Sequence, residues 1–318
     1  INDVQMVNES KFTTSNPWQL QQFLRKAVAA GCEYLVLETS SHALDQSRVW
    51  GVPYAIAVMT NVTREHLDYH HTMAAYREAK KLLFEHTQNA VINADMLAPE
   101  EFAKVVRGQV LLYSTKDKTA DIVAGGIQLD FGRTEFRVGE DLYHLYIPGV
   151  FNIENALAMI GVARLLEIPV STQQAALASI TGVPGRMELV LNNKKVDIII
   201  DYAVTPDAFE KLYASVLPLK IPGTKIVHVF GACGDRDQGK RPILGEIAAK
   251  DADVVILTNE DPYTEDGEKI IDMIEPGVER FKTKDKNYFR IYDRKQAIAK
   301  ALSIAEIGDI VLLTGKGA

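Results

Sequence analysis

Three polar segments near the start of the chain combine residue types that can hold a divalent cation beside a phosphorylated substrate. Residues 38–48 read ETSSHALDQSR and begin with a carboxylate, residues 61–68 read NVTREHLD and contain an imidazole, and Lys80 follows in a helical stretch. Magnesium takes oxygen ligands and keeps waters and phosphate oxygens in its remaining positions. These segments make a phosphate-handling enzyme the leading hypothesis.

The elements expected around these segments place them at one edge of a sheet. An apolar run at residues 34–37 predicts a buried strand that ends at Glu38, and a second run at 55–60 predicts a strand that leads toward His66. Ligands of open α/β sheets bind at the carboxyl ends of strands, so His66 is expected to face Glu38. Taken alone, each residue has a simpler interpretation: Glu38 as a loop carboxylate, His66 as a solvated imidazole and Lys80 as a surface amine.

The same segments resemble the Mur ligase family, most closely its MurE-type UDP-N-acetylmuramoyl-tripeptide synthetases. Residues 38–48 match E-x-S-S-H-x-L-x-Q-x-R, and residues 61–68 match N-[LV]-[ST]-x-[DE]-H-L-D. The MurE-type members use ATP to join an amino acid to UDP-MurNAc-L-Ala-D-Glu. The resemblance implies magnesium ligands at Glu38 and His66. It implies contacts with the UDP-muramoyl-peptide from Thr13, Thr14, Ser40, Gln46 and Arg48.

Lys80 matches the lysine of the family's Y-x-x-A-K-x-x-L-[FY] helix, which is carbamylated by carbon dioxide and then presents a carboxylate to magnesium. The amine must be partly neutral before it can react. Its pKa must therefore be lowered by burial or by nearby positive charge.

Further matches predict a nucleotide site. Asn152 and Asn155 lie one helical turn apart at the start of an expected helix, where amide side chains can cap the helix or hydrogen-bond a base or ribose. The residues alone favour the cap, whereas the resemblance places this segment, together with Asn61, beside the nucleotide.

The segment VPGRME at residues 183–188 matches the family signature that opens the C-terminal domain. The resemblance implies that Arg186 approaches the phosphates and that Asp201 contacts the ribose. Arg186 joins the magnesium ligands as a catalytic candidate. Val204 stands where the family's D-Y-A-H-T-P-D segment has a histidine, which removes a side chain that can donate, accept or carry charge at neutral pH.

Residues 234–240 spell G-x-x-x-x-G-K after an apparent strand but do not predict a phosphate loop. Arg241 stands where such a loop needs Ser or Thr to hold magnesium, and Asp235 and Asp237 would repel phosphate. The family has the same G-D-R-D-x-G-K-R segment in its amino-acid-binding C-terminal domain.

Residues 258–266, TNEDPYTED, match the segment that reads D-N-P-R in the family's meso-diaminopimelate-adding enzymes. Tyr263 stands where that Arg grips a distal carboxylate, and a phenol cannot replace a bidentate guanidinium. This argues against meso-diaminopimelate and favours lysine or another diamino acid, whose distal ammonium Glu260 or Asp261 could face. Without the family, the segment reads as an acidic turn. The resemblance implies amino-acid contacts from Asp261, Pro262, Tyr263 and Gly315.

The printed sequence begins 37 residues before Glu38 and contains no match to the family's G-T-[NT]-G-K-T-T phosphate loop. Because the backbone donors and Lys of that loop cradle the phosphates of ATP, we expect a fragment that is inactive or nearly so alone. Two alternatives stay open. One is a sister ligase such as folylpolyglutamate synthetase, and the other is a non-catalytic module that binds the nucleotide-sugar peptide or a partner.

Composition narrows the class of protein. A chain of 318 residues with 47% hydrophobic content predicts two domains, and a net charge of −7 argues against nucleic-acid binding. Cys32 and Cys233 are too few for a disulfide framework, and no apolar run is long enough to span a membrane. We expect a cytoplasmic monomer that uses ATP and Mg²⁺, takes a UDP-MurNAc-peptide and an amino acid, and binds neither nucleic acid nor membrane.

The alternation of strands and helices predicts an α/β protein with two domains. Residues 1–181 are expected to form a Mur ligase central domain, a mainly parallel sheet with helices and an antiparallel annex at 121–147. Residues 182–318 are expected to form a Rossmann-like C-terminal domain. Expected strands are 34–38, 55–60, 90–93, 110–114, 134–138, 142–147, 196–201, 225–230, 253–258, 288–292 and 309–314. Expected helices are 17–30, 73–87, 152–167, 172–180, 206–216, 240–250, 267–275 and 293–305.

Overall fold

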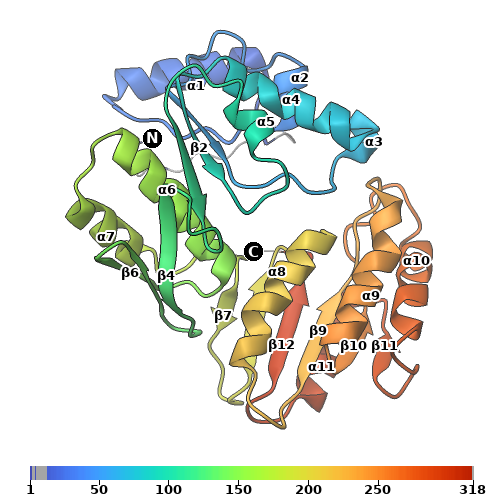
Figure 1. The fold of residues 1–318 in the computed structure, drawn as a ribbon. Coiled ribbons are helices and arrows are strands. Elements are labelled where there is room, and N and C mark those ends of the chain that lie inside the picture. Colours follow the sequence, from blue (N-terminus) through green and yellow to red (C-terminus); the bar gives the residue numbers. More distant parts are fainter. Residues whose placement is uncertain (2–3, 5–12, 317–318) are drawn as a thin grey trace.

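The chain forms two lobes, each built on a six-stranded sheet (Figure 1). The computed structural model describes Ile1, Val4 and residues 13–316. The first sheet has the strand order β1-β2-β3-β4-β5-β6, and the second has the order β11-β10-β9-β12-β8-β7. We call the part that carries the first sheet the first lobe (residues 13–180) and the part that carries the second sheet the second lobe (residues 186–316).

In the first lobe, β1 to β4 run parallel, and β4, β5 and β6 form an antiparallel meander. The predicted mainly parallel sheet with an antiparallel annex is confirmed. The elements of this lobe are α1 (Pro17–Ala29), α2 (Ser41–Asp45), β1 (Ile56–Met59), α3 (Leu67–His70), α4 (Met73–Glu85), β2 (Asn89–Asn93), α5 (Glu100–Ala103), β3 (Val110–Ser114), β4 (Ile122–Gln128), β5 (Thr134–Val138), β6 (Asp141–Leu145), α6 (Val150–Leu165) and α7 (Val170–Ser179).

In the second lobe, five strands are parallel and β7 pairs antiparallel with β8 at the edge of the sheet. The parallel α/β arrangement is confirmed, whereas β7 was not predicted. The elements are β7 (Glu188–Val190), β8 (Asp197–Asp201), α8 (Pro206–Val216), the short 3-10 helices η1 (Leu217–Leu219) and η2 (Gln238–Lys240), β9 (Ile226–Phe230), α9 (Arg241–Asp251), β10 (Val254–Leu257), α10 (Gly267–Glu279), β11 (Tyr288–Arg290), α11 (Arg294–Ile304) and β12 (Ile310–Thr314).

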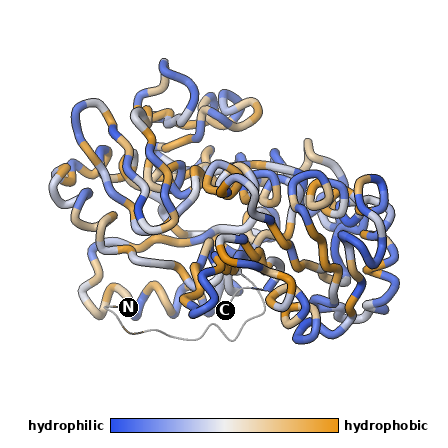
Figure 2. Tube along the Cα trace, turned by 90° about the horizontal axis from the view of Figure 1, so that it is seen from below, coloured by the Kyte–Doolittle hydropathy of each residue, from blue (hydrophilic) through white to orange (hydrophobic). Residues whose placement is uncertain are grey.

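The central strands of both sheets are buried on both faces, because their successive residues enter different apolar clusters. In β2, Val91 packs with α6 while Ala90 and Ile92 pack with α4 and α5. In β9, even-numbered residues face α8 to α10 and odd-numbered residues face α11. Such strands read as continuous apolar runs, which is why the sequence pattern predicts them. Figure 2 shows apolar stretches through the interior of both lobes and hydrophilic segments on the outer loops.

Two glycines allow close contacts between elements. A Cβ at Gly161 in α6 would lie 2.5 Å from Cγ1 of Val91, so the helix rests directly on β2. A Cβ at Gly277 in α10 would lie 2.0 Å from the carbonyl oxygen of Pro242 in α9. This second contact lies beyond residue 275, where α10 was expected to end, and the helix continues through Pro276 to Glu279.

The predicted buried strand at residues 34–38 is wrong. The segment has no regular secondary structure, and no described strand pairs with it. Tyr34 is 63% exposed and Val36 is fully exposed. An apolar run is buried as a strand only where a neighbouring strand and a covering helix are available, and β1 is the end of the described sheet on this side.

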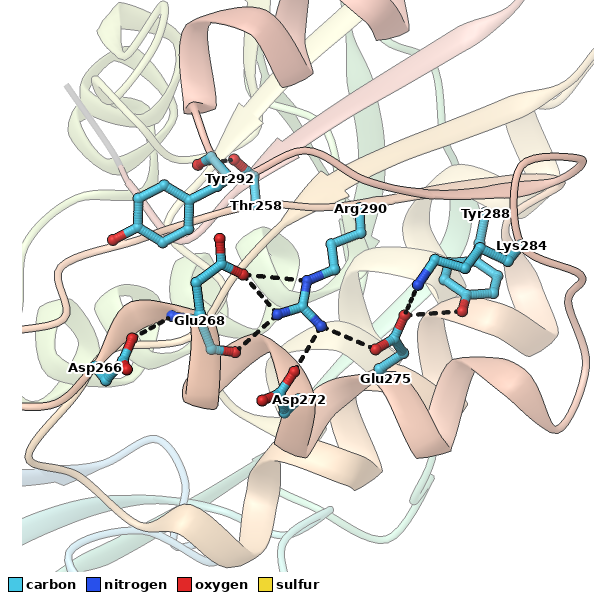
Figure 3. A network of polar contacts seen from close by, with 9 residues as sticks. All are labelled: Thr258, Asp266, Glu268, Asp272, Glu275, Lys284, Tyr288, Arg290 and Tyr292. Carbon is cyan, nitrogen blue, oxygen red and sulfur yellow. Dashed lines mark hydrogen bonds and ion pairs between the residues drawn. The ribbon is translucent and has the colours of Figure 1, made fainter.

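A charged network ties the edge strand β11 to α10 (Figure 3). Arg290 donates to Asp272 at 2.6 Å, to Glu275 at 3.0 Å and to Glu268 at 2.5 Å. Lys284 and the hydroxyl of Tyr288 also donate to Glu275, at 3.0 and 2.9 Å. One guanidinium therefore neutralises a row of carboxylates along the helix.

None of the described helices has both the length and the apolar character needed to cross a bilayer.

Candidate functional site

Four of the five predicted substrate-binding residues are joined by hydrogen bonds. The hydroxyl of Thr14 donates to the carbonyl of Glu38 at 3.0 Å and accepts the backbone N–H of Ser40 at 3.1 Å. Arg48 donates to the carbonyl of Thr14 at 3.1 Å and to Oε1 of Gln46 at 2.8 Å. These bonds fold residues 38–48 back on Thr14, which is buried, while Thr13 beside it is exposed.

Local sequence explains the turn at Ser40. Its hydroxyl accepts the N–H of Ala43 at 3.2 Å and so caps the N-terminus of α2. Serine is among the preferred N-cap residues because its side chain satisfies a backbone donor of the first helical turn. Residues 41–45 therefore leave the extended segment as a short helix, which was not predicted.

Lys80 lies on α4 in a shielded position. Burial lowers the pKa of its amine, while the charges of Glu65 and Glu38 raise it. Nζ lies 5.2 Å from the centre of the Tyr76 ring. The structure thus brings Lys80 and Glu38 into one electrostatic environment and shifts the lysine toward its neutral form.

His66 lies beside this lysine in a group of rings. Burial lowers the pKa of its imidazole most, the positive charge of Lys80 lowers it further, and Glu65 and Asp68 raise it. Its ring centre lies 4.9 Å from that of His42 and 5.7 Å from that of Tyr76. Among the described residues, no three His, Cys, Asp or Glu side chains gather as a metal-binding group. His42 was not among the predicted site residues, although it is the histidine of the E-x-S-S-H match.

The loop that carries His66 also contacts the second lobe. Nδ2 of Asn61 donates to Oδ2 of Asp207 at 3.1 Å, and Nε of Arg64 donates to Oδ2 of Asp237 at 3.3 Å. The predicted contact of Asn61 with a nucleotide stays a prediction, and in this structure the amide is engaged by Asp207.

The residue-based interpretation of Asn152 as a helix cap is wrong. Helix α6 begins at Val150, and its N-cap is Gly149, whose φ of 105° favours glycine. Asn152 lies inside the first turn and donates to the carbonyl of Pro148 at 2.6 Å. Nδ2 of Asn155 faces Oδ1 of Asn152 at 3.4 Å, so the two amides do lie together on one side of the helix.

Asp201 anchors the start of the second lobe. Its buried carboxylate accepts the backbone N–H groups of Met187 and Ala203, each at 2.8 Å. Burial raises the pKa of Asp201, while these two donors and the charge of Arg186 lower it. The guanidinium of Arg186 stacks on the Tyr202 ring at 4.9 Å. Arg186 and Asp201 are therefore neighbours, and their predicted contacts with the phosphates and the ribose stay predictions.

Two loops of the predicted amino-acid site lie against each other. The N–H of Gly234 donates to the carbonyl of Asp261 at 2.9 Å, and a Cβ at Gly234 would lie only 1.9 Å from the carbonyl oxygen of Pro262. Tyr263 is 61% exposed with a φ of 50°, and the guanidinium of Arg236 lies 5.5 Å from its ring. The loop at residues 234–240 thus packs on residues 261–265.

Arg241, which excluded a phosphate loop, fastens these two loops. Its side chain is fully buried and makes two hydrogen bonds of 2.8 Å to the carboxylate of Glu265. It also donates to the carbonyl of Cys233 at 3.1 Å. This role was not predicted, because the sequence does not show that Glu265 lies beside Arg241 in the folded chain.

A buried carboxylate lies at the centre of the same region. Glu260 is 4% exposed, accepts the thiol of Cys233 at 2.9 Å through Oε1, and has no hydrogen-bond partner for Oε2. Burial raises the pKa of Glu260, against the lowering effects of the Cys233 hydrogen bond and of Arg294 and Lys240. Beside it, Asp261 pairs with Lys316 at 2.8 Å.

Comparison with known protein families agrees with this geometry. Residues 2–163 match the Mur ligase middle domain, and residues 185–317 match the Mur ligase glutamate ligase domain. The chain belongs to the Mur ligase family. It is 36% identical over 315 residues to the UDP-N-acetylmuramoyl-L-alanyl-D-glutamate--2,6-diaminopimelate ligase of Clostridium botulinum, with 97% of this chain and 64% of that protein covered. It is 41% identical over 315 residues to the ligase of the same name from Trichormus variabilis, with 96% and 62% covered.

Solved structures of Mur ligases have the same fold. A structure of a UDP-N-acetylmuramoyl-L-alanyl-D-glutamate--2,6-diaminopimelate ligase matches with a TM-score of 0.64 at 32% identity, covering 95% of this chain and 63% of that chain. Folylpolyglutamate synthase of Mycobacterium tuberculosis matches with a TM-score of 0.66 at 18% identity, covering 84% and 62%, which shows a shared fold alone. The chain spans a little under two thirds of the length of these Mur ligase relatives.

Proposed function

We propose that this chain carries the muramoyl-peptide and amino-acid sites of an ATP-dependent ligase that adds a diamino acid to UDP-MurNAc-L-Ala-D-Glu. The observation that carries the proposal is the hydrogen-bonded group of Thr14, Ser40, Gln46 and Arg48, which continues through Glu38 to the environment of Lys80. In this proposal the group holds the muramoyl-peptide, so that its terminal carboxylate lies beside Glu38 and Lys80. The sister-ligase alternative shares the fold but has no use for a muramoyl-peptide site.

The proposed reaction has two steps. The substrate carboxylate attacks the γ-phosphorus of ATP, which forms an acyl phosphate and releases ADP. The amine of the incoming amino acid then attacks the acyl carbon, which forms the amide and releases phosphate. Arg186 approaches the transferring phosphoryl group from the second lobe, where a guanidinium offsets the charge on its oxygens. Asn61, Asn152, Asn155 and Asp201 orient the nucleotide in this proposal.

Lys80 fits the chemistry of carbamylation. Its lowered pKa leaves a larger share of neutral amine, whose nitrogen bonds the carbon of CO₂ with loss of one proton. The resulting carbamate and Glu38 supply oxygen atoms, the ligands that magnesium prefers, and His66 supplies a nitrogen. When bound there, magnesium would neutralise negative charge on the phosphoryl oxygens.

The residues around Glu260 favour an amino acid with a distal ammonium group, such as L-lysine. Glu260 offers a buried carboxylate oxygen without a partner, and Tyr263 cannot bind a carboxylate as a guanidinium does. If the substrate is instead meso-diaminopimelate, Arg236, whose guanidinium lies 5.5 Å from the Tyr263 ring, would receive its distal carboxylate. Comparing L-lysine with meso-diaminopimelate as the added amino acid decides between them.

The first test is calorimetric titration of this chain with UDP-MurNAc-L-Ala-D-Glu. We expect binding that Arg48→Ala abolishes and that Arg137→Ala leaves unchanged. Arg137 is a matched control because it also donates to a backbone carbonyl, that of Glu140 at 2.9 Å, but lies on β5. Absence of binding by folded protein would favour the folylpolyglutamate-type alternative or a module without this ligand.

The second test addresses Lys80 directly. In ¹³C-bicarbonate, a carbamate carbon signal is expected from the unsubstituted chain and from Lys81→Ala, but not from Lys80→Ala. Lys81 is the matched control because it is adjacent but pairs with Glu78 at 2.6 Å. A signal that survives Lys80→Ala would overturn this assignment.

Three further expectations stay predictions. Little or no turnover by these 318 residues alone is tested by an ATP hydrolysis assay with both substrates present. The domain boundary between residues 181 and 182 is tested by limited proteolysis. A cytoplasmic monomer without nucleic acid or membrane ligands is tested by light scattering and by fractionation of cells that express it.

A further inference from the structure

A fully buried histidine, His228, lies in the middle of the second sheet with both ring nitrogens engaged. Nδ1 lies 2.7 Å from the hydroxyl of Tyr213, and Nε2 lies 2.8 Å from the hydroxyl of Thr314. Burial lowers the pKa of His228 to about 3, so the ring is neutral and has one donor and one acceptor. The three side chains therefore form a continuous hydrogen-bonded line from α8 through β9 to the end of β12.

The line ends at a residue that is held from two sides. Thr314 is the last residue of β12 and is 1% exposed. Its hydroxyl meets His228, and its carbonyl accepts Nη2 of Arg294 at 2.7 Å. The hydroxyl and the carbonyl of Thr314 are thus both fixed by buried or half-buried partners.

The next residue forms a wall of the proposed amino-acid site. Gly315 has a φ of 97°, and a Cβ there would lie 2.6 Å from Oε2 of Glu260. Lys316 then pairs with Asp261 at 2.8 Å. A shift of Thr314 therefore moves backbone that touches the unpartnered carboxylate oxygen and the neighbouring acid.

We propose that His228 is a positioning residue of the amino-acid site, which acts through Thr314 to hold Gly315 and Lys316 against Glu260 and Asp261. The inference rests on the proposed function only in taking this site to bind the amino acid. His228 touches no substrate in this proposal. It sets the distance between the β12 end and the loop after β10.

Replacing His228 itself would not separate a positioning role from a purely structural role. The His228 ring packs against Phe209 and Phe230, with ring centres at 5.0 and 4.9 Å, so replacing it would also disturb the core. Thr314→Val avoids this problem because it keeps a β-branched side chain of similar shape and removes only the hydroxyl. Thr314→Ser restores the hydroxyl. Thr87→Val is the matched control, since Thr87 is 1% exposed and its hydroxyl bonds a carbonyl in the first lobe at 3.1 Å.

The experiment measures backbone exchange and affinity on the same chain. Hydrogen exchange by mass spectrometry follows residues 314–316, and calorimetry follows L-lysine and meso-diaminopimelate with UDP-MurNAc-L-Ala-D-Glu at saturation. Loss of a buried hydrogen bond predicts that Thr314→Val speeds exchange at 314–316 about tenfold and weakens amino-acid binding about tenfold. Affinity for UDP-MurNAc-L-Ala-D-Glu stays unchanged, Thr314→Ser behaves as the unsubstituted chain, and Thr87→Val changes neither quantity.

Exchange at residues 314–316 that is equal in Thr314→Val and Thr87→Val would overturn the inference. Faster exchange with unchanged amino-acid affinity would also overturn it, because the β12 end would then not belong to the site. No amino-acid binding by a chain that does bind the muramoyl-peptide overturns the amino-acid site itself. Failure of the proposed function is recognised separately, by loss of muramoyl-peptide binding in the unsubstituted chain.

Discussion

Replacing Arg290 by Gln tests how strongly one guanidinium holds the edge of the second lobe. Arg290 bonds three carboxylates on α10, and its side chain is 22% exposed (Figure 3). A hydrogen bond to a charged group contributes about 1.5–3 kcal/mol when it is shielded from water. Glu268 and Asp272 are more than half exposed, so their bonds contribute little, and most of the effect comes from Glu275, which is 14% exposed. We expect a loss of about 2 kcal/mol at pH 7.

The loss depends on pH with a definite sign. Burial raises the pKa of Glu275, but the bonds from Lys284 and Tyr288 and the charge of Arg290 outweigh it, and the net pKa is lowered. A carboxylate with a lowered pKa stabilises the fold above its ordinary value of 4.5, and this stabilisation is lost as the pH falls through the folded-state value. Removing Arg290 removes part of that stabilisation. The difference between Arg290→Gln and the unsubstituted chain is therefore largest at pH 7 and shrinks below pH 4.5.

Differential scanning calorimetry is the assay, because a chain with two lobes need not unfold in one step. A loss of about 2 kcal/mol in a lobe of this size corresponds to a fall in Tm of roughly 6–10 °C. The control is Arg280→Gln, since Arg280 is 65% exposed and pairs with Glu246 at the surface. A fall in Tm no larger than that of the control at pH 7, or an equal fall at pH 7 and pH 4, would refute the reasoning.

Three shorter predictions address the site and the lobe interiors. Arg241→Met lowers the stability of the second lobe by about 3 kcal/mol because it breaks a buried ion pair, and a calorimetric shift no larger than that of the exposed Arg236→Met contradicts this. Cys233 reacts with iodoacetamide at pH 8 more slowly in the folded chain than in urea, because burial and then the charge of Glu260 raise its pKa to about 12. In the folded chain, Glu260→Gln speeds the reaction of Cys233 with iodoacetamide. Equal rates for Glu260→Gln and the unsubstituted chain, measured by mass spectrometry, would count against the contact between Cys233 and Glu260. Gly161→Ala lowers the calorimetric Tm of the first lobe through about 1–3 kcal/mol of overpacking against β2, and an unchanged Tm shows that the contact yields without cost.

Most of the fold could be predicted from the sequence because its central strands are local apolar runs bounded by polar turns. The same kind of run failed at residues 34–38. Its composition resembles that of β2 or β9, but whether it is buried depends on a pairing partner elsewhere in the chain. Local pattern carries no information about that partner. The antiparallel strand β7 was missed for the same reason, since three residues paired to β8 leave no periodicity to detect.

The candidate site was predictable where a short motif contains the interacting residues. Gln46 and Arg48 lie two residues apart and are hydrogen-bonded, while Ser40 of the same motif is joined to Arg48 through Thr14. Contacts made over long sequence separations were not predictable. His228 and Thr314 are 86 residues apart, and Arg241 and Glu265 are 24 apart. The error at Asn152 arose because a glycine three residues earlier had already started the helix.

The segment at residues 61–68 takes part both in the contact between the lobes and in the placement of His66. One part of it, Asn61 and Arg64, holds the second lobe, and another part presents His66. If docking of the lobes changes the affinity of a ligand at His66 by some factor, that ligand must, by thermodynamic reciprocity, change the docking equilibrium by the same factor. The Arg64–Asp237 contact is modest, since a half-exposed ion pair contributes about 0–1 kcal/mol. Each such kilocalorie corresponds to roughly a fivefold change in an equilibrium constant, so this loop can transmit a graded preference between the lobes rather than a switch.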